Sequence, residues 1–229
     1  KAEELGADAL VIQGSEGGGH TGLTPTTLLL SSVLESVRIP VVAAGGFRDG
    51  SGLAASLAWG ADGIAMGTRF MMTQESPVPK NTKEAYLSAA VEDIKITKKF
   101  DGLSHRLIFN NYIKKIDRSN PMSLFIMSIS SAWKYKKLTK ASYADLTKSF
   151  IAMLKGDDLT ISQSIMSANS PAIIQKAMVE GSPDEGAMPS GQVAGLISNL
   201  PTCKELIDEI MREFTSAVAN LRSIDGDKL

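Results

Sequence analysis

The sequence predicts an α/β protein in which short apolar strands alternate with helices, followed by a helical subdomain. Three segments are predicted strands because each is short and mostly apolar, as expected for parallel strands covered on both faces; they lie at 7–12, 40–44 and 62–66. Two phrases, 2–8 and 57–62, run from a helix end through a glycine into a strand start, and so indicate successive βα units. Beyond Pro77 this alternation stops and apolar residues recur at helical spacing.

A glycine-rich segment, 13–22, follows the first predicted strand. Three consecutive glycines remove every side chain from one turn, so the backbone can approach a flat or phosphorylated ligand closely. They are Gly17, Gly18 and Gly19. His20 follows them, and an imidazole can accept and return a proton near neutrality. The segment predicts a cofactor site beside a proton-transfer group; the alternative is a loop histidine that only hydrogen-bonds the backbone.

The helices that follow the first two strands carry recognisable start signals. Thr24 is placed to cap a helix for which Pro25 suits the first position, and this helix is expected to extend to about Val37. A second helix, rich in small residues, is expected from 49 to 59.

Such βα units fit either an open doubly wound sheet or a (β/α)8 barrel, and the loops favour the barrel. In barrels, the loops after the last two strands commonly hold a phosphate. Here the corresponding loops contain Gly45, Gly46, Gly67 and Thr68. Freed backbone N–H groups and the Thr68 hydroxyl suit phosphate oxygens, and Arg69 is placed to add charge. For either loop taken alone, a simple tight turn explains the glycines equally well.

We expect three segments along the chain. Residues 1–79 form barrel strands and helices, 80–188 a helical insertion, and 189–229 a return segment with a final helix. Helices within the insertion are expected near 80–92, 121–132, 143–154 and 171–180. Thr202 and Glu205 have capping-box spacing ahead of the final helix, whose apolar stripe predicts packing against the α/β part.

The charge balance and the apolar content of the sequence limit the kinds of partner that the protein can bind. Because 24 Lys and Arg face 25 Asp and Glu, no basic excess exists to hold nucleic acid or an anionic membrane. The only cysteine, Cys203, cannot form an internal disulfide, and no apolar run is long enough to cross a bilayer. We expect a cytoplasmic protein with small-molecule partners and assign no metal ligands. Since residues 1–5 resemble the end of a helix, we also expect this chain to be the carboxyl-terminal part of a longer protein.

Four ordered motifs resemble the nitronate monooxygenases, formerly called 2-nitropropane dioxygenases. They lie at 17–22, 40–50, 60–70 and 189–195. The resemblance implies an FMN-dependent (β/α)8 barrel of which this chain supplies the last three βα units, with a helical domain inserted after the last strand. It implies that His20 takes the α-proton of a nitroalkane or positions the nitronate, and that O2 receives the electrons. A homo-oligomer is compatible with it.

The FMN contacts expected from the motifs are Gly17, Gly18, Gly19, Ala44, Gly45, Gly46, Gly67 and Thr68. Two other functions stay open: a flavin-dependent enoyl-acyl carrier protein reductase that uses NAD(P)H, and an inactive or incomplete barrel that only binds a partner. Glu16 is expected to be solvated, although orienting His20 is the alternative. His105 is expected at the surface, and Cys203 is assigned no role.

Overall fold

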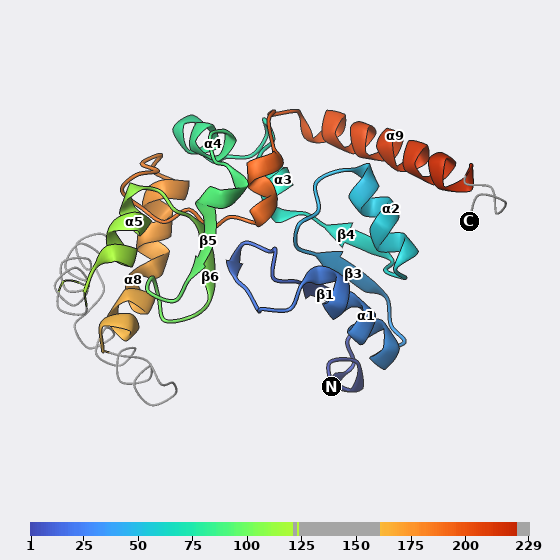
Figure 1. Ribbon diagram of the computed structural model, residues 1–229, viewed down its shortest axis with the longest axis horizontal. Coiled ribbons are helices and arrows are strands. Elements are labelled where there is room, and N and C mark those ends of the chain that lie inside the picture. Colours follow the sequence, from blue (N-terminus) through green and yellow to red (C-terminus); the bar gives the residue numbers. More distant parts are fainter. Residues whose placement is uncertain (121–122, 124–160, 224–229) are drawn as a thin grey trace. The chain divides into compact units, whose positions relative to one another are not determined.

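The computed structural model describes residues 1–120, 123 and 161–223, which form two compact units (Figure 1). Unit 1 comprises Lys1–Ser76 and Gly191–Leu229, and unit 2 comprises Pro77–Ser190. The helices expected at 121–132 and 143–154 lie outside the described residues. No helix within the described residues is long and apolar enough to cross a membrane.

Unit 1 contains a three-stranded parallel sheet in the order β1-β3-β4. Its strands are β1 (Leu10–Gln13), β3 (Val41–Ala44) and β4 (Gly63–Ala65), with Ile12 opposite Ala43 and Ala43 opposite Ile64. β3 and β4 lie within the segments predicted from the sequence, while β1 overlaps the segment predicted at 7–12 but ends one residue later, at Gln13. Because the strands are parallel, their carboxyl ends share one edge, and the loops that leave this edge are those rich in glycine.

The helices of unit 1 complete the βα pattern. They are α1 (Thr26–Ser36), α2 (Gly50–Ala58), the short α3 (Gly67–Met71) and α9 (Cys203–Arg222), and two 3-10 turns, η1 (Glu3–Leu5) and η3 (Gln192–Leu196), accompany them. The core lies between α1 and the sheet, where Leu30, Val41 and Ala43 are almost fully buried. Because α1 packs on β1 and β3, the glycine-rich loop that connects β1 to α1 is held at both of its ends.

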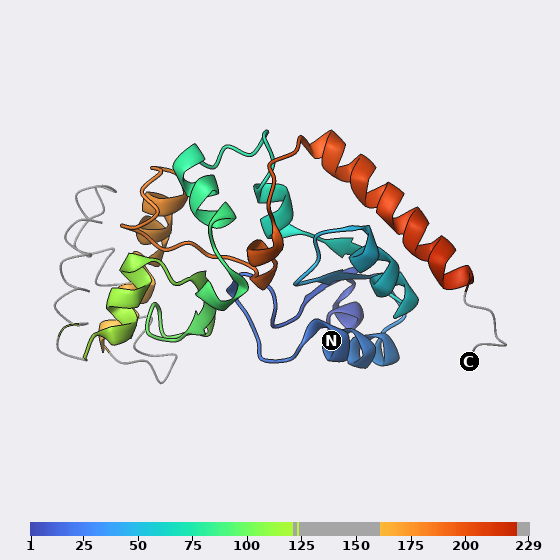
Figure 2. The same ribbon diagram turned by 45° about the horizontal axis from the view of Figure 1, so that its top comes forward.

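The final helix, α9, packs along α2 (Figure 2). Thr202 and Glu205 form the predicted capping box at its start, and Leu206 and Ile210 on its inner face are buried. A Cβ at Gly50 would lie 2.2 Å from the Ile210 carbonyl oxygen, so only glycine allows the α9 backbone to approach this closely. The apolar stripe therefore correctly predicted that the final helix packs against the α/β part, here on α2.

Unit 2 is not purely helical, which corrects the description of 80–188 as a helical subdomain. Its helices α4 (Lys80–Leu87), α5 (Asn111–Arg118) and α8 (Ile161–Met178) accompany the turn η2 (Val91–Asp93) and an antiparallel hairpin of β5 (Ile94–Thr97) and β6 (His105–Ile108). The hairpin was missed because each strand has only four residues, too few for a clear period of two. The helix α8 also begins earlier than the helix expected near 171–180, and Pro171 lies inside it.

The hairpin and two helices enclose the core of unit 2. Phe100 and Leu107 from the hairpin region pack with Ile113 and Ile116 of α5 and with Ile173 of α8. The Asn110 side chain caps α5 by accepting a hydrogen bond from the Ile113 amide at 2.9 Å. Unit 2 therefore has a hydrophobic core of its own.

Candidate functional site

The loop after β1 is tied back to the strand that precedes it. The Gln13 amide nitrogen donates to the His20 carbonyl oxygen at 3.2 Å, and the Thr21 hydroxyl donates to the Gly14 carbonyl oxygen at 3.2 Å. The Ser15 amide donates to the Thr24 carbonyl at 2.8 Å. These bonds hold the two-residue strand β2 (Gly19–His20) beside the carboxyl end of β1, while the His20 residue remains exposed.

The glycines of this loop serve different purposes. A Cβ at Gly14 would lie 2.1 Å from the Thr26 hydroxyl and 2.4 Å from the Thr26 backbone, so this position is sterically restricted to glycine, whereas a Cβ at Gly17 would lie 2.4 Å from the Gln13 side chain and would displace it. Gly19 has φ +74° and no atom within 4 Å of an added Cβ, so it is required by its backbone conformation and faces open space. The loop is thus packed on one side and open at the residue that precedes His20.

Glu16 is not solvated as expected; it ties three segments of unit 1 together. Its carboxylate accepts hydrogen bonds from the Thr26 amide at 3.0 Å and from the Thr26 hydroxyl at 2.8 Å, and its carbonyl oxygen accepts one from the Gln192 amide at 2.9 Å. Glu16 therefore caps α1 in place of Thr24, since Pro25 occupies the N-cap position without a side-chain bond. A carboxylate at a helix amino end is also favoured by the helix dipole.

Replacing Glu16 with alanine is expected to lower the free energy of unfolding by about 0.5–2 kcal/mol, the range for loss of a helix N-cap. The measurement is chemical denaturation followed by circular dichroism. Glu35→Ala is the matched control, because Glu35 is exposed at the other end of α1. Equal losses for the two variants would contradict the capping role.

The loops after β3 and β4 lie at the same sheet edge as the glycine–histidine loop. Gly45 and Gly46 adopt φ +101° and +82°, a left-handed conformation that favours glycine. The Thr26 hydroxyl lies 3.1 Å from the Gly45 carbonyl oxygen and so connects this loop to the first one. After β4, Gly67 begins α3, and no atom lies within 4 Å of a Cβ added there. Open space at Gly67 leaves room for a ligand to approach the backbone.

Thr68 and Arg69 connect this last loop to the return segment. The Thr68 hydroxyl oxygen accepts a hydrogen bond from the Gly191 amide at 3.0 Å, which leaves its own proton for another acceptor. Arg69 is 5% exposed and donates to the Asn199 side chain at 2.8 Å and to the Asn199 carbonyl at 3.3 Å. Burial lowers the pKa of its guanidinium. Arg69 therefore holds the return segment, and the structure does not support the expectation that it adds charge to the glycine loop.

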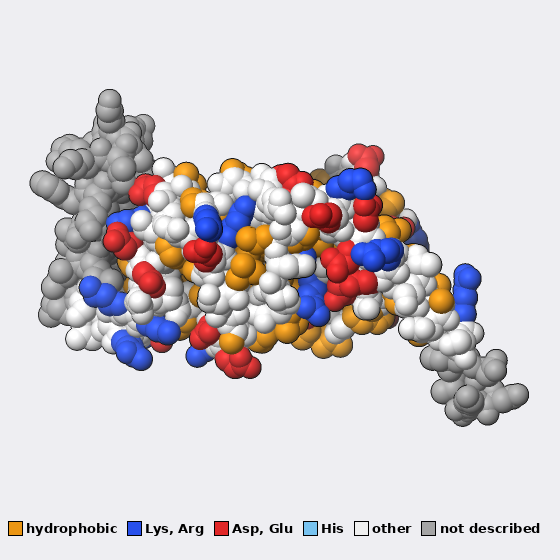
Figure 3. Space-filling view, turned by 90° about the horizontal axis from the view of Figure 1, so that it is seen from above, with side chains coloured by type: hydrophobic (Ala, Val, Ile, Leu, Met, Phe, Trp, Pro, Cys, Tyr) orange, Lys and Arg blue, Asp and Glu red, His pale blue; other side chains and the backbone are white. Residues whose placement is uncertain are grey.

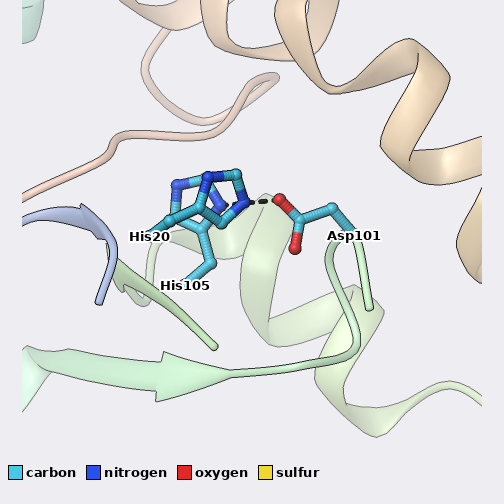
Figure 4. Close-up of side chains that lie close together, drawn as sticks. All are labelled: His20, Asp101 and His105. Carbon is cyan, nitrogen blue, oxygen red and sulfur yellow. Dashed lines mark hydrogen bonds and ion pairs between the residues drawn. The ribbon is translucent and has the colours of Figure 1, made fainter. Parts of the chain in front are cut away.

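His105 of unit 2 is buried, which corrects the expectation that it lies at the surface. Its Nδ1 lies 2.8 Å from an Asp101 carboxylate oxygen (Figure 4), and both side chains are at most 3% exposed. The Phe100 ring meets the imidazole edge-on, with 5.1 Å between ring centroids. The four-residue spacing of Asp101 and His105 was the available signal, but it did not reveal the hairpin turn that buries the pair.

Cys203 lies at the start of α9, where its backbone amide donates to the Glu75 carboxylate at 2.8 Å. Its sulfur lies 3.5 Å from the Thr73 hydroxyl. These contacts tie α9 to the segment after α3 and give the thiol a structural setting.

Comparison with known proteins gives a family match and several relatives. The nitronate monooxygenase family model matches residues 1–213. A Rhodococcus jostii protein named (3aS,4S,5R,7aS)-5-hydroxy-7a-methyl-1-oxo-octahydro-1H-indene-4-carboxyl-CoA dehydrogenase is 48% identical over 213 residues, which are 93% of this chain and 60% of the relative. A probable nitronate monooxygenase from Staphylococcus aureus is 38% identical over 126 residues, which are 51% of this chain and 36% of that protein.

Among solved structures, the M276A mutant of FabK from Thermotoga maritima matches with a TM-score of 0.71 and 30% identity. The match covers 98% of this chain and 57% of FabK. The chain thus spans about 60% of the length of its Rhodococcus relative and a similar share of the FabK structure.

Proposed function

Because the chain belongs to the nitronate monooxygenase family, we propose that it forms part of a flavin-dependent oxidoreductase whose flavin is FMN. The observation that carries this proposal is the arrangement at one edge of the parallel sheet. There the histidine loop and two further glycine loops leave the carboxyl ends of neighbouring strands. Ligands of parallel α/β folds bind at such edges.

The residues present fit a flavin phosphate. Gly46 is in a left-handed conformation and, among the described residues, its amide donates no hydrogen bond, while Gly67 faces open space. The Thr68 hydroxyl has a proton to donate, because it already accepts from Gly191. Backbone amides and a neutral hydroxyl suit phosphate oxygens. The proposed FMN contacts are Gly17, Gly18, Gly19, Ala44, Gly45, Gly46, Gly67 and Thr68.

His20 is the proposed proton acceptor. It is exposed at the open side of its loop, and the bonds from Gln13 and Thr21 fix the backbone that carries it. A fixed imidazole can take a proton from an acidic carbon near neutral pH. When bound, the flavin supplies the two-electron oxidation that His20 cannot perform.

Two classes of substrate suit this chemistry, because a nitroalkane and a coenzyme A thioester both have an acidic C–H group, and a nitronate is the anion that remains after the nitroalkane loses this proton. The first is a nitroalkane or its nitronate with O2 as the electron acceptor, which the family name and the Staphylococcus relative support. The second is a coenzyme A thioester, which the name of the 48% identical Rhodococcus relative supports. A flavin-dependent enoyl-acyl carrier protein reductase that uses NAD(P)H remains the third candidate, supported by the likeness to FabK.

To test the proposal, the complete flavin-bound protein is assayed with a substrate of each class. If the protein oxidises nitronates, we expect it to consume O2 with an alkyl nitronate. We expect no O2 consumption with a coenzyme A thioester, or with NADPH and an enoyl thioester. Flavin reduction by a coenzyme A thioester in the absence of O2, without turnover of the nitronate, would assign the second class. A complete protein that binds no flavin would refute the whole proposal.

The same proposal extends to the architecture. We propose that β1, β3 and β4 belong to a (β/α)8 barrel, with 80–188 inserted between the barrel part, 1–79, and the return segment, 189–229. β1 is an edge strand of the sheet among the described residues, and Val11 on one face of this strand is 68% exposed, which supports the proposal. Exposed strand edges in native proteins are normally covered or paired.

A further inference from the structure

A polar pocket of about 160 Å³ lies in unit 1, apart from the loops assigned to the flavin. It is lined by the start of α2, by α3, by the return segment after η3 and by the inner face of α9. No residue of the glycine–histidine loop lines it. Figure 3 shows acidic and basic side chains lying next to one another on the surface over α9.

Arg69 brings a buried positive charge to this pocket. It is 5% exposed, and both of its hydrogen bonds go to neutral oxygens of Asn199. Within the described residues, no carboxylate forms an ion pair with its guanidinium. A buried cation without an anion is costly, and three of the five guanidinium N–H groups remain after those two bonds.

Arg48 adds a second guanidinium to the lining. Its Nε lies 3.1 Å from an Asp49 oxygen, and its Nη1 donates to the Leu196 carbonyl at 2.5 Å. The like charge of Arg48 contributes to the lowered pKa of Arg69, after the larger effect of burial. Two cations thus approach each other where the structure provides Asp49 for only one of them.

The acidic residues of the lining do not neutralise Arg69 by direct contact. Glu213 accepts a hydrogen bond from the Gly50 amide at 2.8 Å, so its carboxylate is committed to the start of α2. Glu209 attracts Arg69 from α9 without forming an ion pair with it. An anion entering the pocket would meet the free donors of Arg69, and Glu209 would weaken its binding by repulsion.

We propose that this pocket binds a small oxyanion, namely a phosphate or the phosphate group of a larger ligand, through Arg69 and Arg48. Planar guanidinium groups hold tetrahedral oxyanions through paired N–H donors, which lysine cannot reproduce. The hydroxyl-bearing residue Ser198 also lines the pocket. Arg48 and Arg69 follow the glycine loops closely in the sequence, but none of the residues proposed to contact FMN lines this pocket.

In the test, the complete protein is titrated with inorganic phosphate at constant ionic strength. Binding is measured by calorimetry and by NMR of the arginine side chains. We expect Arg69→Gln to weaken phosphate binding at least tenfold, Arg48→Gln to weaken it less, and Glu209→Gln to tighten it. Thr68→Val is the control for the flavin loop, and it should weaken FMN binding while leaving phosphate binding at the pocket intact. Arg48→Gln keeps the test valid if Arg69→Gln fails to fold, because Arg48 is partly exposed.

Coenzyme A and dephospho-coenzyme A distinguish the two sources of the oxyanion. If coenzyme A binds more tightly than dephospho-coenzyme A, and this difference is lost in the Arg69 variant, the pocket binds the phosphate group of a larger ligand. Equal binding of both compounds, together with phosphate binding, would assign it to free phosphate. Phosphate binding that is absent, or unchanged in both arginine variants, would overturn the proposal, even if the flavin chemistry is found as proposed.

Discussion

His20→Ala in the complete protein is expected to leave FMN bound but to slow proton abstraction from a neutral nitroalkane by about 10²–10⁴-fold, the range for general acid–base groups. The reason is that His20 is the exposed imidazole on a loop whose backbone is fixed by Gln13 and Thr21. The measurement is the rate of flavin reduction in a stopped-flow instrument without O2. Flavin absorbance of the variant before mixing confirms that the cofactor is retained.

Preformed nitronate is the internal control for the role of His20, because it no longer carries the proton to be removed. If His20 acts only as a base, the nitronate reaction should lose much less rate than the nitroalkane reaction. Equal losses with both substrates across pH would mean that His20 positions or stabilises the anion. An unchanged rate with both would leave it a structural loop residue.

Gly46→Val is expected to abolish FMN binding. Gly46 has φ +82°, where a branched residue is strained by roughly 1–2 kcal/mol, and its side chain would lie 3.3 Å from the Glu16 Cβ. Both effects move the loop that carries the proposed phosphate donors. Fluorescence titration with FMN measures the affinity directly.

Gly6→Val is the matched control for backbone strain, because Gly6 has φ +91° and no atom within 4 Å of an added Cβ. We expect it to lower stability through the same strain while FMN binding stays intact. A Gly46→Val protein that binds FMN with unchanged affinity would place the phosphate elsewhere.

The parts of unit 1 that the sequence predicted well are those encoded locally. The strand at 41–44 is a continuous apolar run, and Thr202 lies three residues before Glu205, so neither depends on knowing the rest of the fold. The family membership was predicted from short motifs with fixed spacing and is confirmed by the match over 1–213.

The predictions that were wrong depend on the path that a loop or turn takes rather than on a local residue pattern. Glu16 caps a helix ten residues away through a loop whose path the sequence does not specify. His105 is buried because a hairpin turn brings it to Asp101 and Phe100, and four-residue strands give too weak a pattern to predict that hairpin. The assigned roles of His20 and of the phosphate loops remain predictions.

The bonds between the strand-end loops and the return segment also bear on the order of folding. Gly191 bonds to Thr68 across 123 residues, and Asn199 bonds to Arg69 across 130. Such distant contacts form late, because the chain between them must first be brought together at an entropic cost. In refolding experiments, the β1-β3-β4 sheet should therefore form before the loops reach their final geometry, and competence to bind FMN should appear as the last and slowest phase.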